Sequence, residues 1–144
     1  MKQATKPSIT AVKLYDIRNY PDVNGNLAFI EETRDIPFAI KRIFYVYGVH
    51  PGDIRGQHAH RRCKQFLICV NGTVTVTCDD GRQKQAFTLD SPLRGLYIPP
   101  RIWAEQSYAG SDTMLVVLTD KYFAESDYIR DYKRFVIRRG LKRI

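Results

Sequence analysis

The sequence predicts an all-β fold, a sandwich or a barrel, because three features recur along the chain. Short apolar runs rich in β-branched and aromatic residues alternate with turn residues. The dipeptides Asn71-Gly72 and Asp80-Gly81 separate consecutive runs and supply positive φ at little cost. Segment 73–78, TVTVTC, alternates polar and apolar residues, which predicts one buried strand face. A length of 144 residues with 44% hydrophobic content fits one domain, residues 1–144.

The apolar runs predict strands in a definite order. We expect them at Ala11–Asp16, Leu27–Glu32, Ala39–Tyr47, Gln65–Val70, Thr73–Cys78, Lys84–Thr88, Gly95–Ile98 and Thr113–Thr119. The two turn dipeptides would join the fourth, fifth and sixth runs as three consecutive antiparallel strands. In segment 126–135 the period of two is lost and aromatic residues fall near helical spacing. We therefore expect one short C-terminal helix there, with Ser126 or Asp127 as its N-cap.

Composition narrows the class of protein. The net charge of +8 favours anionic partners, which include nucleic acid, acidic membrane surfaces and phosphorylated metabolites. Cys63, Cys69 and Cys78 are odd in number and have no CxxC spacing, which predicts reduced core thiols in a cytoplasmic protein. The first ten residues contain no apolar h-region, and no uncharged apolar stretch approaches about eighteen residues. We expect neither secretion nor a membrane span.

The segment most informative about chemistry is 52–60, GDIRGQHAH, followed by Gln65 and by Gly72. It resembles the first cupin motif, in which two histidines separated by one residue point from one strand into a β-barrel. Metal-binding cupins carry an acidic residue where Gln65 or Lys64 stands here, and a further histidine where this chain has Ala104. A tight divalent site needs three or four protein ligands. We therefore expect no metal.

The likeness extends beyond that motif. Segment 40–81, with LDSPLRGLYIPPRIW downstream and FAESDYIRDYKRF near the end, resembles the dTDP-4-keto-6-deoxyglucose 3,4-ketoisomerases from about Val23 to Phe135. The resemblance implies a cupin-like jelly-roll barrel without metal or cofactor, and a homodimer that exchanges N-terminal strands. It also implies an enzyme of deoxysugar biosynthesis that moves the keto group of a dTDP-linked 4-keto-6-deoxy sugar from C4 to C3.

Two histidines suit that reaction, which needs proton transfers at two carbons and between two oxygens. A neutral imidazole with a pKa near physiological pH can perform each transfer. An isolated His-x-His is more often a plain strand feature, but the glycine spacing, the all-β pattern and Arg55 favour a functional pair. By resemblance, His60 would handle the carbon protons and His58 the oxygens or the complementary step. Tyr45 matches a family tyrosine suspected of polarising a sugar oxygen, although an aromatic cross-strand pair explains it equally well.

The substrate-binding candidates are Arg55, Arg42, Gln57, Asn24, Trp103 and Ala104. Guanidinium groups suit bidentate contacts with a diphosphate, although a solvated strand-edge charge is the favoured explanation of Arg42. Trp103 could line the pocket or belong to the core. Two positions depart from the family, since Ala104 stands where histidine is common and Asn24 where arginine is common. The configuration at C4 of the product therefore stays open.

Alternatives from two other classes remain. A metal-dependent dioxygenase would need a third ligand, and a sugar 3,5-epimerase would be expected to present a His–Asp pair that the motif does not supply. A sugar-nucleotide sensor that has lost catalysis fits the missing side chain at Ala104. A nucleic-acid binder would use the basic tail, which contains Lys133, Arg134, Arg138, Arg139, Lys142 and Arg143. No aromatic stacking platform interleaves with that tail, so nucleic acid is disfavoured.

Overall fold

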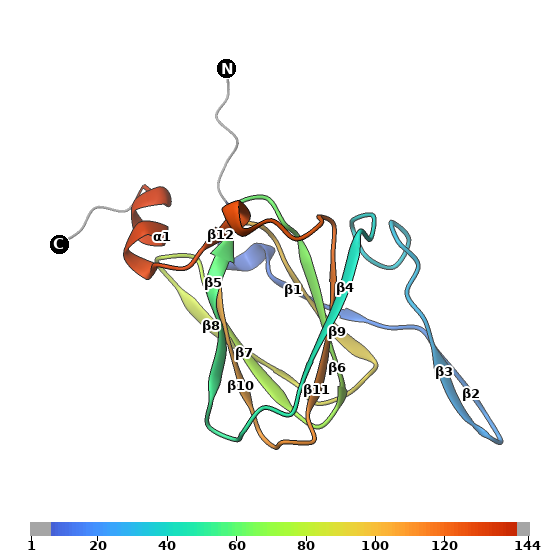
Figure 1. The fold of residues 1–144 in the computed structure, drawn as a ribbon. Coiled ribbons are helices and arrows are strands. Elements are labelled where there is room, and N and C mark those ends of the chain that lie inside the picture. Colours follow the sequence, from blue (N-terminus) through green and yellow to red (C-terminus); the bar gives the residue numbers. More distant parts are fainter. Residues whose placement is uncertain (1–6, 141–144) are drawn as a thin grey trace.

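The computed structural model describes residues 7–140, and their strands form a barrel of two facing sheets (Figure 1). The first sheet has the order β1 (Lys13–Asp16), β9 (Arg94–Ile98), β6 (Gln65–Asn71), β11 (Met114–Thr119) and β4 (Arg42–Tyr47). The second has the order β12 (Tyr128–Ile129), β5 (Ile54–His60), β10 (Trp103–Tyr108), β7 (Val74–Asp79) and β8 (Lys84–Leu89). Every pairing in the two sheets is antiparallel.

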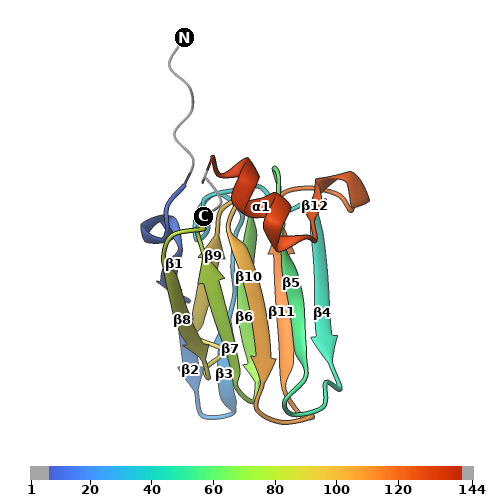
Figure 2. The ribbon, with the colours of Figure 1, turned by 90° about the vertical axis from the view of Figure 1, so that its left-hand side faces the viewer.

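Three smaller features complete the fold. A hairpin of β2 (Asn19–Asp22) and β3 (Gly25–Ala28) projects from the barrel. The helix α1 (Tyr132–Arg138) crosses one end of the second sheet (Figure 2). Two short 3₁₀ turns lie at Ile9–Ala11 and Glu125–Asp127. The prediction of an all-β fold with one short C-terminal helix is confirmed.

The core lies between the sheets and is built from alternate strand positions. Leu67 and Cys69 of β6 face Val74, Val76 and Cys78 of β7, and all five side chains are fully buried. The residues between them on β7 are half-buried, as the TVTVTC pattern predicts. The three cysteines are buried and unpaired, which confirms their prediction as core thiols.

A second apolar cluster covers the outer face of the first sheet. Phe66 and Ile68 of β6 and Leu118 of β11 point outward there. Ile36 and Phe38, from the segment between β3 and β4, pack onto them. This packing fixes the segment that leads into β4. The side chains of β4 then alternate between the barrel interior and solvent.

Most predicted strands are present with bounds within three residues, but the expected run of three paired strands is wrong. Asp80-Gly81 does join β7 to β8. Asn71-Gly72 is instead a corner, because β6 belongs to the first sheet and β7 to the second. Gly72 has φ +77°, and a Cβ there would lie 2.6 Å from Oγ1 of Thr113. The close approach to Thr113 accounts for glycine at the point where the chain changes sheets.

Other boundaries differ for local reasons. Leu27–Glu32 is strand only at its first two residues, which end β3. Strand β10 was not predicted because its sequence, WAEQSY, has no apolar alternation. The helix begins after Asp131, whose side chain accepts a hydrogen bond from the backbone N–H of Arg134. Ser126 and Asp127 are therefore not its N-cap, since the chain first forms a 3₁₀ turn and then β12 against β5.

No helix within residues 7–140 has the length and apolar character needed to cross a membrane. Of the basic tail, Lys142 and Arg143 lie outside the described residues.

Close packing at Gly95 gives a stability prediction. A Cβ at this β9 position would lie 2.1 Å from the ring of Phe66, which is 1% exposed. We expect Gly95→Ala to lower the free energy of unfolding in urea by about 1–3 kcal/mol, because a packed core cannot absorb an added methyl group. Gly110→Ala is the matched control, since its new methyl group would meet only the exposed carboxylate of Asp112. Equal stability of the two variants would contradict the prediction.

Candidate active site

A cavity of about 410 Å³ opens between the sheets at the strands that carry the histidine motif. It is lined by Phe44, Val46, Arg55, Gly56, Gln57, His58, Gln65, Gln106, Tyr128 and Arg130. These residues come from β4, β5, β6 and β10, and from β12 with the residue after it. The lining combines an apolar wall from β4 with amide, imidazole, phenol and guanidinium groups, which suits a polar, charged ligand.

Both motif histidines point into the barrel from β5, while Ala59 between them packs outside. The rings of His58 and His60 lie 5.0 Å apart between centroids and nearly perpendicular. A β-bulge precedes them, because three steps of β5 from Arg55 to His58 oppose two steps of β10. Gly56 lies in the bulge with φ +83°, and a Cβ there would be 3.1 Å from the side-chain nitrogen of Gln106. The bulge thus lets neighbouring residues of β5 line one cavity.

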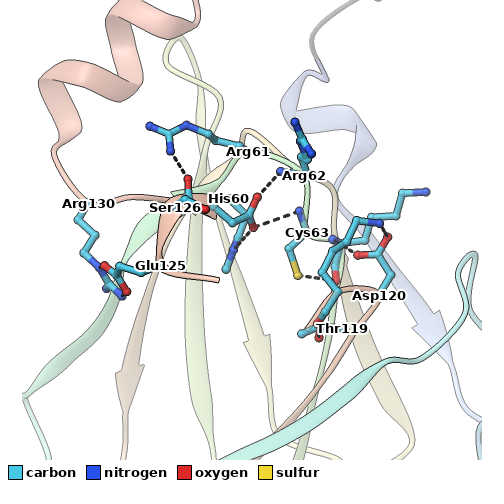
Figure 3. Close-up of polar contacts among 12 residues, drawn as sticks. His60, Arg61, Arg62, Cys63, Thr119, Asp120, Glu125, Ser126 and Arg130 are labelled. Atoms are coloured by element: carbon cyan, nitrogen blue, oxygen red, sulfur yellow. Dashed lines mark hydrogen bonds and ion pairs between the residues drawn. The ribbon is translucent and has the colours of Figure 1, made fainter. Parts of the chain in front are cut away.

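His60 is held by a carboxylate from a distant part of the chain. Its Nδ1 lies 2.9 Å from Oδ2 of Asp127, and the ring is 5% exposed. The same carboxylate accepts the backbone N–H groups of Arg62, at 2.8 Å, and Cys63, at 3.3 Å. Figure 3 shows His60, Arg62 and Cys63 lying against the segment that carries Ser126. Because a carboxylate only accepts, Nδ1 carries the proton and Nε2 keeps its lone pair.

That lone pair is available for chemistry. Nε2 of His60 is buried and makes no hydrogen bond within residues 7–140. The sequence motif did not reveal the partner, since Asp127 is 67 residues away and was interpreted as a helix cap. The motif itself supplies no His–Asp pair, as predicted, but the fold adds one through Asp127, so this ground for disfavouring an epimerase no longer holds.

Burial keeps both imidazoles neutral. Burial, together with smaller contributions from His60 and Arg130, lowers the pKa of His58 to about 3. Burial also lowers the pKa of His60, against the opposing effect of the Asp127 hydrogen bond. Near physiological pH both rings therefore have an unprotonated nitrogen, which is the state needed to accept a proton.

The lowered pKa values predict acid sensitivity. In the unfolded chain His58 and His60 bind protons as pH falls through about 6.5, whereas in the folded protein His58 stays neutral down to about pH 3. The unfolded state thus holds more protons in this window, and stability falls with pH by up to about 1.4 kcal/mol per unit for each histidine. Urea midpoints measured between pH 7 and 4 should decline, and less steeply in His58→Asn. An equal slope in that variant would contradict this assignment.

Two further residues enter the site from the segment that sequence reasoning made helical. The ring of Tyr128 lies 4.9 Å from His58 and 4.4 Å from His60, between centroids. Arg130 places its guanidinium 4.3 Å from the Tyr128 ring and pairs with Glu125 through two contacts of 2.8 and 3.1 Å. Pairing of Tyr128 with His60 in β12 and β5 fixes this arrangement.

Of the other predicted site residues, some line the cavity and some do not. Arg55 and Gln57 line the cavity. Ala104 is buried and stands directly opposite His58 in the pairing of β10 with β5. Arg42 does not line the cavity, and it is not a solvated charge either. Its guanidinium lies 5.0 and 5.5 Å from two phenylalanine rings, and its Nε is buried.

Three predicted site residues lie away from the cavity. Tyr45 is 62% exposed on the outer face of β4 and stacks on Tyr47, because the cavity-facing aromatic of that strand is Phe44. Trp103 packs outside the barrel against α1, so its assignment to the core is the better one. Asn24 lies in the turn of the projecting hairpin.

One group of side chains could be considered for a metal. Ligand atoms of His60, Cys63 and Asp127 all lie within 4.8 Å of one another. Burial raises the pKa of the Cys63 thiol to about 11, which disfavours the thiolate that metals bind. The Asp127 carboxylate already accepts three N–H donors. Chemistry without a metal therefore stays our prediction.

Comparisons with known proteins agree on one group of enzymes. A family model described as FdtA, WxcM-like, C-terminal, matches residues 10–140. The TDP-4-oxo-6-deoxy-α-D-glucose-3,4-oxoisomerase of Aneurinibacillus thermoaerophilus is 42% identical over 123 residues, which is 85% of this chain and 88% of that protein. QdtA, a sugar 3,4-ketoisomerase of Thermoanaerobacterium thermosaccharolyticum crystallised with TDP, is 34% identical. The match covers 92% of this chain and 97% of QdtA with a TM-score of 0.89, which confirms the cupin-like barrel.

Two other solved structures bear on substrate and fold. A histidine-to-asparagine variant of QdtA was crystallised with TDP-4-keto-6-deoxyglucose, and it is 34% identical over 92% of this chain and 96% of its own, with a TM-score of 0.89. The dTDP-4-dehydrorhamnose 3,5-epimerase of Bacillus anthracis is 17% identical over 88% of this chain and 81% of its own, with a TM-score of 0.74. At that identity the likeness concerns the fold alone.

Proposed function

This chain belongs to the FdtA family, and on that basis we propose that it is a dTDP-sugar 3,4-ketoisomerase acting on dTDP-4-keto-6-deoxyglucose. The observation that carries the proposal is a pair of adjacent, neutral, buried imidazoles, of which His58 lines a polar cavity and His60 is oriented by a carboxylate. Reversible proton transfer at carbon needs a base of this kind. Arg55 at the same cavity supplies positive charge for a diphosphate, whereas Arg130 is already paired with Glu125.

The positions of the two histidines suggest a division of labour. His58 lines the cavity, whereas His60 lies behind it, so we revise the sequence-based assignment and place His58 at the carbons. His58 removes the proton from C3 while the C4 oxygen gains one, which gives an enediol. The C3 oxygen then loses its proton and C4 gains one, so that protons balance. His60 moves the oxygen protons, directly or through the hydroxyl of Tyr128 beside it.

The substrate contacts follow from the lining. Arg55 is placed for the diphosphate, and Gln57, Gln65 and Gln106 present amides suited to sugar hydroxyls. Ala104 is buried directly opposite His58 and does not line the cavity, but a larger side chain there would approach His58. We propose that the small side chain at this position influences which face of C4 is protonated.

Incubation with dTDP-4-keto-6-deoxyglucose in deuterated water, followed by NMR, tests the proposal. We expect deuterium at C3 or C4 and a 3-keto product whose C4 configuration is read from the same spectrum. Binding of the sugar nucleotide without deuterium incorporation would contradict catalysis and favour a sensor. Deuterium at C5 would instead indicate an epimerase.

We also propose a homodimer that exchanges the β2–β3 hairpin. Tyr20 and Leu27 on this hairpin are 51% and 59% exposed, although both are large and apolar. The outer face of the edge strand β4 is also apolar, with Ile43 and Tyr45 exposed. An exposed apolar hairpin and an exposed apolar edge strand are each typical of an interface. The predicted role of Asn24 depends on this exchange, because within one chain it lies away from the cavity.

Substitution in the hairpin tests the dimer. Leu27→Asp should weaken the dimer at least about tenfold, because a buried interface position would receive an unpaired charge. Light scattering coupled to size-exclusion chromatography measures the mass. Ile137→Asp, at a similarly exposed position on α1, should leave the dimer intact. A monomeric parent protein, or equal dimerisation of both variants, would refute the exchange.

A further inference from the structure

A second cavity, of about 250 Å³, lies outside the barrel beside α1 and β12. Four arginines and two apolar residues line it: Arg61, Arg101, Arg138, Arg139, Ile129 and Phe135. Figure 2 shows that α1 and β12 lie close together at one end of the barrel. This cavity shares no lining residue with the cavity that contains His58.

Three of the four arginines at this cavity have no ion-pair partner among the described residues. These three are Arg61, Arg101 and Arg139. Arg61 donates to the backbone carbonyl of Ser126, and Arg139 donates through Nε to the carbonyl of Asp80 at 2.8 Å. Both acceptors are neutral, so these two hydrogen bonds do not balance the positive charge of Arg61 and Arg139.

Two carboxylates, Asp79 and Asp80, attract Arg139, and both already accept other donors. Asp80 accepts the backbone N–H groups of Ile9, Arg82 and Gln83 at 2.8–2.9 Å. Its attraction opposes, without cancelling, the burial that lowers the pKa of Arg139. The cluster therefore concentrates positive charge in a partly buried place, which favours an anion.

Two donors of the cluster have no acceptor. Nε of Arg101 and Nη1 of Arg139 are buried and make no hydrogen bond within the described residues. Buried donors without acceptors are rare and often mark an ion or water that belongs to the site. Arg101 is also fixed in place, because its backbone has φ +64° and its N–H donates to the carbonyl of His60 at 2.6 Å.

Stabilisation of α1 does not explain the whole cluster. Arg138 and Arg139 end the helix, where a positive charge interacts favourably with its dipole. Arg61 and Arg101 come from the loops after β5 and β9, and that explanation does not extend to them. Arginines from three separate segments meet at this cavity. Such clusters typically bind phosphate, because each guanidinium offers a fork of N–H donors.

We propose that this cavity binds a phosphate-bearing anion of the pyrophosphate type at a site separate from the catalytic cavity. The shared chemistry is a diphosphate group, which could belong to free pyrophosphate or to a second nucleoside diphosphate. The inference does not rest on the proposed isomerase activity, since it concerns charge and unpaired donors on the other side of β12.

Calorimetric titration of pyrophosphate into the full-length protein tests the site. The protein is first saturated with TDP to fill the catalytic cavity, and ionic strength is held constant. We expect one pyrophosphate per chain, and binding at least about tenfold weaker in the double variant Arg101→Gln, Arg139→Gln. The double variant Arg34→Gln, Arg94→Gln has the same net charge and alters exposed residues, so it should bind like the parent protein.

A second arm separates the two sources. Titration of TDP alone gives two sites per chain if a nucleoside diphosphate is the occupant, with one site removed in the Arg101, Arg139 double variant. One TDP site together with a retained pyrophosphate site assigns free pyrophosphate. The proposal is overturned if TDP binds at only one site per chain and prevents pyrophosphate binding there, or if the two double variants bind pyrophosphate equally. Unchanged circular dichroism and isomerase activity of the Arg101, Arg139 variant would show that lost binding is not lost folding.

Discussion

Replacing His58 with asparagine should lower turnover of dTDP-4-keto-6-deoxyglucose by about 100- to 10,000-fold, the usual contribution of a positioned general base. Asparagine preserves a polar side chain of similar reach but has no basic nitrogen. His58 lines the cavity, and its low pKa keeps the ring neutral across the physiological range. NMR measures the proton transfers directly, as deuterium at C3 of recovered substrate and at C4 of the 3-keto product. The affinity for TDP should change only a few-fold, because Arg55 provides the anion contact.

The third histidine of the chain offers a matched control. His50 is exposed in the loop between β4 and β5 and does not line the catalytic cavity. His50→Asn removes an imidazole in the same way and should keep parental turnover. If His58→Asn and His50→Asn turned over substrate at similar rates, the base role of His58 would be refuted.

The features that could be predicted from the sequence are those that depend on a short, local pattern of residues. The alternation in segment 73–78 and the Asp80-Gly81 turn correctly gave β7 and its pairing with β8, because side-chain period and turn chemistry are local. The His-x-His spacing likewise placed both imidazoles on the inner face of β5. Asn71-Gly72 looked like the same kind of turn, yet it is a corner. The difference depends on Thr113, more than forty residues away, and the turn residues carry no information about it.

The phase of β4 shows the same limit within one strand. Tyr45 and Phe44 are adjacent aromatics, and a shift of one residue exchanges which of them faces the cavity. The packing of Ile36 and Phe38 helps to set which residues of β4 face inward. The sequence around these two residues does not predict that packing. As a result this chain presents a phenyl ring, without a hydroxyl group, on that wall. Tyr128 is the tyrosine beside the histidines instead.

The His60–Asp127 pair changes how the alternatives are separated. A sugar 3,5-epimerase was disfavoured because the motif alone supplied no carboxylate, and the fold supplies one through β12. The preference for a ketoisomerase therefore rests on family membership and on the position of deuterium in the product. The pair could be found only from the antiparallel register of Tyr128 with His60, which no pattern in the tail encodes.

Replacing Asp127 with asparagine should lower kcat by about 10- to 1,000-fold with little change in KM, although Asp127 is not expected to touch the substrate. The carboxylate fixes the proton of His60 on Nδ1, which leaves the lone pair on the unpartnered Nε2. An asparagine that keeps its oxygen on the N–H of Arg62 turns its amide N–H toward His60. The ring must then carry its proton on Nε2 and cannot accept one there.

The pH profile distinguishes this positioning role from lost stability. The hydrogen bond to Asp127 raises the pKa of His60 against the effect of burial, so its loss lowers that pKa. Activity that requires neutral His60 falls as the ring is protonated in acid, and the acid limb should therefore move to lower pH in Asp127→Asn. Asp131→Asn, at the N-cap of α1, is the control, since asparagine caps helices as well as aspartate does. A parental kcat and an unshifted acid limb of the pH profile in Asp127→Asn would contradict the positioning role. The carboxylate would then only hold the loop after β5 through Arg62 and Cys63, and His60 would adopt the required tautomer without it.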